Sequence, residues 1–373
     1  MSVSYIPEKT KVRLWGKAAG RCQYKGCTEP LWYDGLTKAE FNSAYIAHIV
    51  ADKPDGPRGD IERSEILKQD ISNLMLMCDA HHRLIDRQKV DEHSEEVLLQ
   101  MKKEHEDKME LLTSLTEDKQ SHVLLYGANI GGNKAKLSMD EAIQAMLPNK
   151  YPADKNPIEL SLSNSSLEDH EEFYWKMERM HLQRQYKDKV EPRLKITVNH
   201  MSVFAMAPQP LLIELGRLIT DIQPAEVYQP HRDPDYWMWE ADEETFDYQI
   251  IRPEIKSEIV ALNISLSASI DNSRIYDVLG GNVSIWTITI DSPYNDFLRS
   301  REQLQKFREK FRKLMNAIKK EHGQHSEIHL FPAAPVAIAV EIGRAWMPKA
   351  DLPLKVYDQN KLNNQFEYTL EIN

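Results

Sequence analysis

The chain has 373 residues, a formal net charge of −11, 41% hydrophobic residues and 28% charged residues. This length is too great for one ordinary core and fits two or three domains, and no apolar run approaches the roughly 20 residues that cross a bilayer. The acidic balance excludes a surface that binds nucleic acid everywhere, because non-specific affinity comes mainly from neutralising phosphates. We therefore expect a protein without a membrane span, whose contacts with DNA are local.

All three cysteines lie in the first quarter of the chain. Cys22 and Cys27 form a Cys-x4-Cys pair, in which Gly26 eases the turn that points both thiols inward. Cys78 and His81, at Cys-x2-His spacing, supply the other two ligands of a tetrahedral metal site. We predict a structural Zn2+ site held by these four residues. Three cysteines used in this way favour the reducing cytoplasm, without disulfide bonds.

A histidine in the next β-prone run, His48 in residues 45–50, would on its own more often be a core residue than a catalyst. Residues 73–77 predict a second strand that enters a helix near residue 78. A β-hairpin followed by a helix brings His48 opposite His82. Because His81 and His82 are adjacent, either could be the zinc ligand, and position favours His81.

These residues resemble the HNH endonucleases, which are built on a ββα-metal fold. The resemblance implies an α+β nuclease domain with a zinc knuckle over residues 1–125. It implies that His48 is the general base that takes a proton from water, that Asn73 fixes the loop, and that His82 binds a catalytic Mg2+. Many members carry a second metal ligand where this chain has Ala47, so we expect a ligand-poor site in which Mg2+ keeps much of its water.

Three further segments follow in chain order. Residues 52–60 form a turn-rich loop that would place Lys53 or Arg58 on DNA phosphate, or would serve as a solvated connector. Residues 94–115 carry apolar side chains at helical spacing and predict the helix that closes the first domain. Glycine, proline and serine then recur over 126–165, which we interpret as a linker. One short helix is expected inside it, because residues 138–141 have the form of a capping box.

Strand-like and helix-like runs alternate in residues 166–373. β-branched residues predict strands at 195–198, 259–267, 283–290 and 327–331, and an amphipathic pattern predicts a long helix at 295–321. This alternation favours an α/β domain with a mainly parallel sheet and helices on its faces.

The same region repeats itself. A Glu-x-Gly-Arg motif occurs at 214–217 and again at 341–344, each time seven residues after an Ala-Pro pair. Two α/β halves, fused in tandem and related by a pseudo-twofold axis, fit this pattern. We interpret the repeated glutamate and arginine as contacts on or between helices.

Ligands of such sheets bind at the carboxyl ends of strands, near helix N-termini that favour anions. The two strand-to-helix turns, at 207–210 and 332–335, would face a phosphate-bearing ligand, and residues 228–239 add a cation and aromatic rings that could stack on bases. Alternatively, Trp237 and Trp239 of this segment pack beneath a loop. Candidate ligand contacts, chosen from their positions in turns, are Gln209, Pro210, Arg232, Trp237, Pro335 and Lys349.

Residues 202–212, 227–239, 328–335 and 341–344 resemble the SAVED domain, a fused pair of CARF-like, Rossmann-like modules that senses cyclic oligonucleotides. The resemblance covers residues 166–373, and with the N-terminal motif the whole chain resembles the HNH-SAVED effectors of CBASS antiphage immunity. It implies an endonuclease that degrades double-stranded DNA after a cyclic di- or trinucleotide binds. It also implies that binding drives assembly into a dimer or higher homo-oligomer.

Two other hypotheses stay open. A modification-dependent restriction endonuclease would use the C-terminal domain to read a DNA base and would need no second messenger. A non-catalytic zinc module joined to a nucleotide sensor would act through partner binding, and Ala47 gives this hypothesis some weight. Substitution of His48 by alanine separates the hypotheses, because a scaffold would keep its function.

Overall fold

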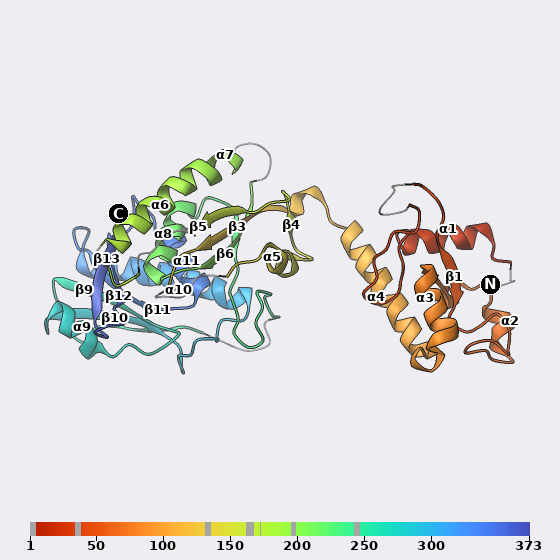
Figure 1. Cartoon of the computed structure of the whole chain (residues 1–373). Helices are drawn as coiled ribbons and strands as arrows, with labels where there is room; N and C mark the ends of the chain where they lie inside the picture. The colour runs from red at the N-terminus through yellow and green to blue at the C-terminus, as the bar shows by residue number, and fades with distance from the viewer. Residues whose placement is uncertain are drawn as a thin grey trace. The chain divides into compact units, whose positions relative to one another are not determined.

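The structure is a computed structural model and describes residues 5–33, 39–130, 136–161, 168–171, 173–194, 199–241 and 247–373. The chain divides into unit 1 (Met1–Thr116) and unit 2 (Glu117–Asn373), whose elements are labelled in Figure 1. Each unit has a hydrophobic core of its own. Among the described residues, none of the helices is long and apolar enough to cross a membrane.

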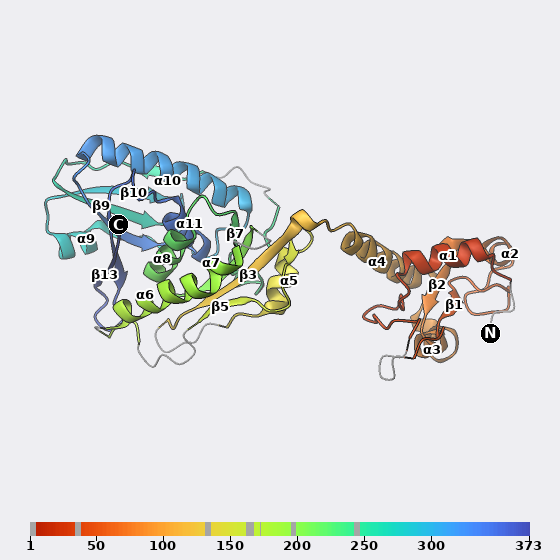
Figure 2. The same ribbon diagram turned by 90° about the horizontal axis from the view of Figure 1, so that it is seen from above.

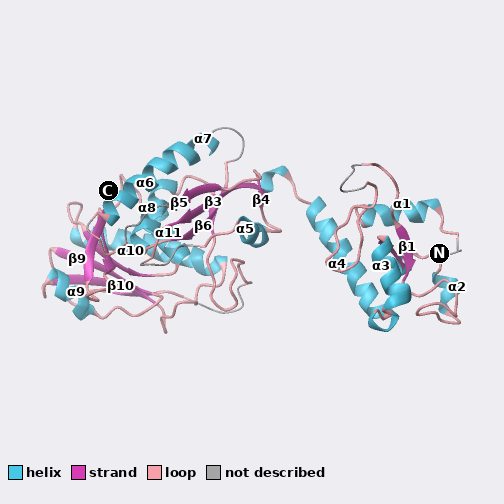
Figure 3. Cartoon of the chain, viewed as in Figure 1, coloured by secondary structure: helices cyan, strands magenta, loops and turns pink. Residues whose placement is uncertain are grey.

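Unit 1 contains a short antiparallel hairpin followed at once by a helix. β1 (Tyr45–His48) pairs with β2 (Leu74–Met77), and His48 stands opposite Leu74. After the single residue Cys78, α3 (Asp79–Arg83) begins and continues into the π-helical turn η2 (Leu84–Gln88). Figure 3 shows this small magenta hairpin among the cyan helices of unit 1. The order of strand, strand and helix is the one that the sequence predicts.

Helices close unit 1 around the hairpin. All four side chains of β2 are buried, and they share a core with Leu14 and Leu98. Leu98 lies on α4 (Glu95–Thr113), which begins where the Ser94 hydroxyl accepts a hydrogen bond from the backbone N–H of Val97. The other helices are α1 (Glu8–Lys17), α2 (Arg63–Leu67), η1 (Ile71–Asn73) and η3 (Val90–Glu92).

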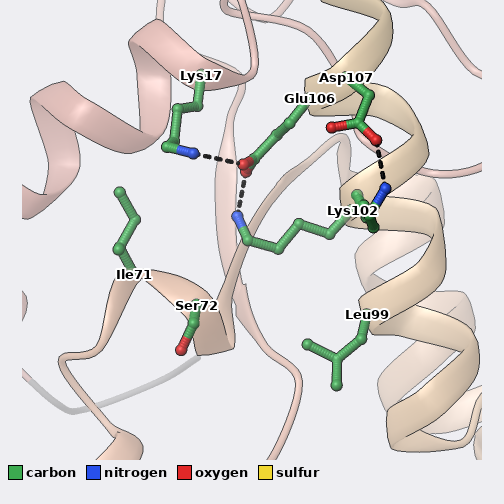
Figure 4. A pocket seen from close by; sticks show the side chains of 8 residues that line it. Lys17, Ile71, Ser72, Leu99, Lys102, Glu106 and Asp107 are labelled. Carbon is green, nitrogen blue, oxygen red and sulfur yellow. Dashed lines mark hydrogen bonds and ion pairs between the residues drawn. The ribbon is translucent and has the colours of Figure 1, made fainter.

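A hollow of about 380 Å³ lies between α1, η1 and α4. Figure 4 shows Lys17 and Lys102 both reaching the carboxylate of Glu106, and the Lys17 Nζ to Glu106 Oε2 distance is 2.9 Å. Burial lowers the pKa of Lys102. Burial would raise the pKa of Glu106, but the hydrogen bonds from the two lysines outweigh it and lower that pKa. The ion pair between Lys17 and Glu106 therefore joins α1 to α4, and Lys102 pairs with the same carboxylate.

The first half of unit 2 is a parallel sheet with helices. Its strands have the order β4-β3-β6-β7, and β5 also pairs with β3. Every pairing in this sheet is parallel. Its strands are β3 (Gln120–Gly127), β4 (Tyr151–Pro152), β5 (Ile158–Ser161), β6 (Met201–Met206) and β7 (Ala225–Val227). Its helices are η4 (Glu117–Lys119), α5 (Met139–Met146), α6 (Tyr174–Gln185), η5 (Tyr186–Val190), α7 (Glu191–Leu194) and α8 (Gln209–Ile219).

The second half of unit 2 is a six-stranded sheet of order β13-β12-β11-β9-β10-β8. Its four central strands are parallel, and both edge strands are antiparallel, so the mainly parallel sheet expected from the sequence is present. Its strands are β8 (Gln249–Ile251), β9 (Ile259–Ser265), β10 (Val283–Thr289), β11 (Ile328–Ala333), β12 (Leu354–Gln359) and β13 (Phe366–Ile372). Its helices are α9 (Asn272–Leu279), α10 (Arg301–His322) and α11 (Val336–Ala345).

The structure corrects the linker predicted at residues 126–165. β3 lies between β4 and β6 in the first sheet, and β4, β5 and α5 also fall in or next to this stretch. Unit 2 therefore starts at Glu117, and the supposed connector is part of its first half. α5 occupies the predicted short helix, with Ser138 at the N-cap position but without a side-chain hydrogen bond. The strand predicted at 195–198 lies outside the described residues.

The two halves of unit 2 meet where α8 crosses α11, which lie side by side in Figures 1 and 2. A Cβ added at Gly216 would lie 1.9 Å from the carbonyl oxygen of Val340, and a Cβ added at Gly343 would lie 1.9 Å from that of Ile213. The contacts are reciprocal, as a pseudo-twofold axis requires. The repeated glycines are therefore present because only glycine lets the two backbones approach so closely.

The repeated glutamates and arginines also act at this crossing. Glu214 and Glu341 are buried, and each accepts a hydrogen bond from the arginine three residues later on its own helix. Arg344 also donates to backbone carbonyls of the first half, including that of Gln223 at 3.0 Å. The second motif of the repeat thus joins the two halves, in agreement with its interpretation as a set of helix contacts.

Gly216→Ala and Gly343→Ala are each expected to destabilise unit 2 by about 2 kcal/mol or more, because a methyl group there forces the helices apart. The double variant should lose less than the sum, since one separation relieves both contacts. Gly281→Ala is the matched control, because a Cβ there meets nothing within 4 Å. Calorimetry of the full chain measures these effects, and an unfolding transition of Gly216→Ala equal to that of the control would contradict this account of the crossing.

Candidate functional site

The four side chains predicted to bind zinc converge in unit 1. The ligand atoms of Cys22, Cys27, Cys78 and His81 all lie within 4.8 Å of one another. Gly26 has a φ of +81°, a backbone conformation that lets the loop between the first two cysteines turn back. Cys78 is the N-cap residue of α3, and His81 lies in the first turn of that helix. Two pairs that are distant in sequence therefore meet.

The distances and the donor set fit a tetrahedral zinc ion. His81 Nδ1 lies 3.6 Å from Cys22 Sγ and 3.1 Å from Cys78 Sγ, and ligand atoms around one zinc ion stand roughly 3.5 Å apart. Burial raises the pKa of the Cys22 and Cys78 thiols, so thiolates at this position need a cation beside them. The Tyr24 ring stacks on the His81 ring at 4.1 Å between centroids and fixes its orientation.

His82 has different partners from His81. Its ring stacks on Tyr45 of β1 at 4.9 Å between centroids, and its Nε2 lies 3.3 Å from Asp86 Oδ2. Burial lowers the pKa of His82, and the nearby Asp86 partly opposes this effect. Consecutive residues on a helix face different sides, so the geometry assigns His81 to the cysteines and leaves His82 for another role.

His48 ends β1 and is only 6% exposed. Its Nε2 lies 3.0 Å from the backbone carbonyl oxygen of Lys68. A carbonyl oxygen only accepts hydrogen bonds, so Nε2 carries the proton in this contact and Nδ1 keeps its lone pair. Nδ1 is therefore the nitrogen through which this ring can act as a base.

Asn73 holds the loop that follows β1. Its Oδ1 accepts from the backbone N–H of Val50 at 2.7 Å, and its Nδ2 donates to the carbonyl of Val50 at 2.8 Å and to that of Leu67 at 3.3 Å. The side chain is 4% exposed. Asn73 therefore ties the residues after His48 to the start of β2.

Asp86 is a candidate metal ligand that the sequence analysis missed. It lies four residues after His82, and this spacing puts both side chains on one face of a helical segment. Neighbouring ligand atoms of an octahedral Mg2+ stand about 3 Å apart, close to the 3.3 Å between His82 Nε2 and Asp86 Oδ2. Ala47 is 1% exposed and offers no ligand atom. The residues present thus fit a divalent ion that takes two protein ligands and otherwise binds water.

The structure corrects the expectation that Arg58 reaches DNA phosphate. Its side chain is 9% exposed and donates to acceptors inside unit 1. Lys53, the other candidate of this loop, is exposed.

In unit 2, the two strand-to-helix turns predicted to face a ligand do meet. Gln209, the first residue of α8, accepts through Oε1 from the backbone N–H of Ala334 at 3.1 Å. Pro335 is the N-cap residue of α11, and Pro210 is buried. Sequence reasoning missed Gln229, whose Oε1 accepts from the backbone N–H of Ala337 at 3.0 Å. Two glutamines of the first half therefore bind the backbone at the start of α11.

The other candidate contacts of unit 2 have different surroundings. The Trp237 ring is 6% exposed and packs on Phe204 at 5.4 Å between centroids, so it is a core residue and offers no face for stacking on a base. The Arg232 side chain is exposed. Lys349 follows the C-terminal end of α11, whereas Pro335 caps its start. Ten helical residues span about 15 Å, so the two ends of α11 are that far apart.

Comparisons with known proteins concern mainly unit 2. Residues 182–372, slightly more than half of the chain, match the family model SAVED, described as "SMODS-associated and fused to various effectors sensor domain". A comparison with curated proteins found no match.

Solved structures similar to this chain include the Cap4 SAVED/CARF-domain containing receptor of Acinetobacter baumannii with the cyclic trinucleotide 2'3'3'-cAAA. It is 13% identical, with a TM-score of 0.42 over 75% of this chain and 56% of that chain. The Moraxella osloensis Cap4 receptor is 12% identical, with a TM-score of 0.43 over 75% and 58%. This chain therefore spans less than two thirds of the length of these receptors.

Proposed function

This chain belongs to the SAVED family of sensor domains, and on that premise we propose that it is a messenger-gated nuclease of bacterial antiphage defence. Unit 2 binds a cyclic di- or trinucleotide. Unit 1 is an HNH endonuclease that holds a structural Zn2+, uses Mg2+ and cuts double-stranded DNA. Family membership supports the sensor half of this proposal, and the geometry of unit 1 supports the nuclease half.

One observation carries the nuclease half. A hairpin and the helix after it present a histidine whose Nδ1 keeps a lone pair, a loop fixed by an asparagine side chain, and a second histidine paired with a carboxylate. These are His48, Asn73, and His82 with Asp86. The Cys3His cluster next to this helix supports the same proposal, since it anchors Cys78 and His81 and so positions His82.

The proposed reaction is hydrolysis of a phosphodiester. His48 Nδ1 takes a proton from a water molecule, the water oxygen forms a bond to phosphorus, and the bond from phosphorus to the leaving oxygen breaks. The leaving oxygen receives a proton from solvent. A divalent ion held by His82 and Asp86 would neutralise charge on the phosphate and on the leaving oxygen.

The messenger can switch on cleavage only if it binds the active state of the protein more tightly than the inactive state. We expect that state to be a homo-oligomer in which nuclease units act in pairs, one for each DNA strand. Light scattering of the full chain with and without messenger measures this assembly. A ligand-bound monomer with full activity would contradict it.

Plasmid degradation by the purified full chain in Mg2+, run against a panel of cyclic di- and trinucleotides, tests the proposal. We expect cleavage with one or a few of these nucleotides and none without them. Cleavage of modified DNA alone, independent of nucleotide, would support a restriction endonuclease. Binding of a nucleotide without cleavage of any DNA would support the non-catalytic zinc module.

A further inference from the structure

The loop between β1 and α2 is folded tightly around one arginine. A Cβ added at Gly59 would lie 2.3 Å from the carbonyl oxygen of Pro54, and one added at Gly56 would lie 2.6 Å from Ala51 Cβ. Arg58, between these glycines, has a φ of +57°, a left-handed conformation that non-glycine residues adopt at a cost. These close contacts and this φ fix the backbone at Arg58 more tightly than a solvated connector requires.

The guanidinium of Arg58 binds two elements at once. On the side of β1, Nε donates to the carbonyl of Ile49 at 2.6 Å and Nη2 to that of His48 at 3.4 Å. On the side of the helix, Nη1 donates to the carbonyl of Ile85 at 2.8 Å and Nη2 to Asp86 Oδ1 at 2.9 Å. These four acceptors surround a planar group whose donors point in fixed directions.

Both elements carry residues of the proposed site. The strand ends in His48, the proposed base, and the helical segment carries His82 and Asp86, the proposed ligands of the divalent ion. Because Arg58 takes one oxygen of Asp86, the other oxygen is left toward His82 Nε2, at 3.3 Å. A single side chain thus joins the base to the metal ligands and orients the carboxylate.

We infer that Arg58 is a positioning residue of the nuclease site: it holds the end of β1 against the helix and aims Asp86 at the ion that His82 binds. This inference rests on the proposed function. Lysine keeps the charge but offers one point of attachment, so Arg58→Lys should lose the alignment while it retains the ion pair.

The test compares full-length, zinc-loaded variants by Mn2+ binding, followed by electron paramagnetic resonance, and by plasmid cleavage with the activating nucleotide. Arg58→Lys is expected to weaken Mn2+ binding and to lower kcat by about tenfold or more, with the KM for DNA unchanged. In an Asp86→Asn background, Arg58→Lys should cause no further loss of Mn2+ affinity. Arg63→Lys is the matched control, because Arg63 makes an exposed ion pair with Glu95 in the same unit.

Two outcomes would overturn the inference while the proposed function stands. One is that Arg58→Lys has the same Mn2+ affinity and the same kcat as the parent protein. The other is that Arg58→Lys weakens Mn2+ binding by the same factor in the parent and in the Asp86→Asn background. His82→Ala distinguishes failure of the proposed function: if parent and His82→Ala bind Mn2+ alike, the proposed metal site is wrong and the inference fails with it.

Discussion

His81→Ala is expected to lose the zinc ion, whereas His82→Ala, one residue away, is expected to retain one zinc ion per chain. Of the two histidines, His81 presents a ring nitrogen to the three cysteines, and His82 has Tyr45 and Asp86 as its partners. Binding of a structural zinc ion contributes about 10–16 kcal/mol in small zinc domains, as much as the total stability of about 5–15 kcal/mol of an ordinary domain. Loss of the ion should therefore unfold unit 1.

Elemental analysis of the purified variants measures the zinc content, and calorimetry measures the unfolding of each unit. Cys78→Ser should behave as His81→Ala does, and in both variants the transition of unit 2 should persist, because unit 2 has its own core. Equal zinc content in the two histidine variants would contradict the assignment. A parent protein that contains no zinc after growth in zinc-supplemented medium would contradict the site itself.

His48→Ala is expected to lower messenger-dependent DNA cleavage by about 10²–10⁴-fold, the usual contribution of a general base. The loss should appear in kcat, because the imidazole acts on water and is not needed to bind DNA. His48 also donates a hydrogen bond to the carbonyl of Lys68, so alanine removes a structural contact together with the base.

His48→Gln separates these two roles. The glutamine amide can donate to the same carbonyl but cannot take a proton from water. We expect His48→Gln to match the parent in zinc content and unfolding temperature and to be as inactive as His48→Ala. Substantial cleavage by His48→Gln would show that the histidine is structural and that the base lies elsewhere.

Local spacing was enough to predict much of unit 1. The turn between two cysteines, each short strand and the helix start are each encoded by a few consecutive residues, so Cys22, Cys27, Cys78 and His81 could be grouped from sequence alone. The partners of Arg58 could not. Three of its four acceptors are backbone carbonyls. Because every residue carries such a carbonyl, no sequence motif indicates these contacts. The sequence signal for Asp86 is its spacing of four residues from His82, which places both side chains on one face of a helical segment.

In unit 2, predictions from local composition were wrong about where the domain begins and about the role of Trp237. Glycine and proline suggested a linker from residue 126, yet β3 had already begun at Gln120 and is held inside the sheet by strands on both sides. The long helix begins at Arg301, later than predicted, because Ser300 and Gln303 form a capping box there. Trp237 is a core residue because Phe204, distant in sequence, packs against it.

At the crossing of α8 and α11, the two copies of the repeat carry the same residue, glycine. At the starts of the two helices, the copies carry different residues. In a dimer of identical chains, every substitution appears on both sides of the axis. Here the copies lie on one chain, so the glycines of the crossing match while the helix starts differ, with Gln209 in one copy and Val336 at the same position of the other. Such an asymmetric pair can present unlike chemistry to the two ends of one bound molecule, which a symmetric pair cannot.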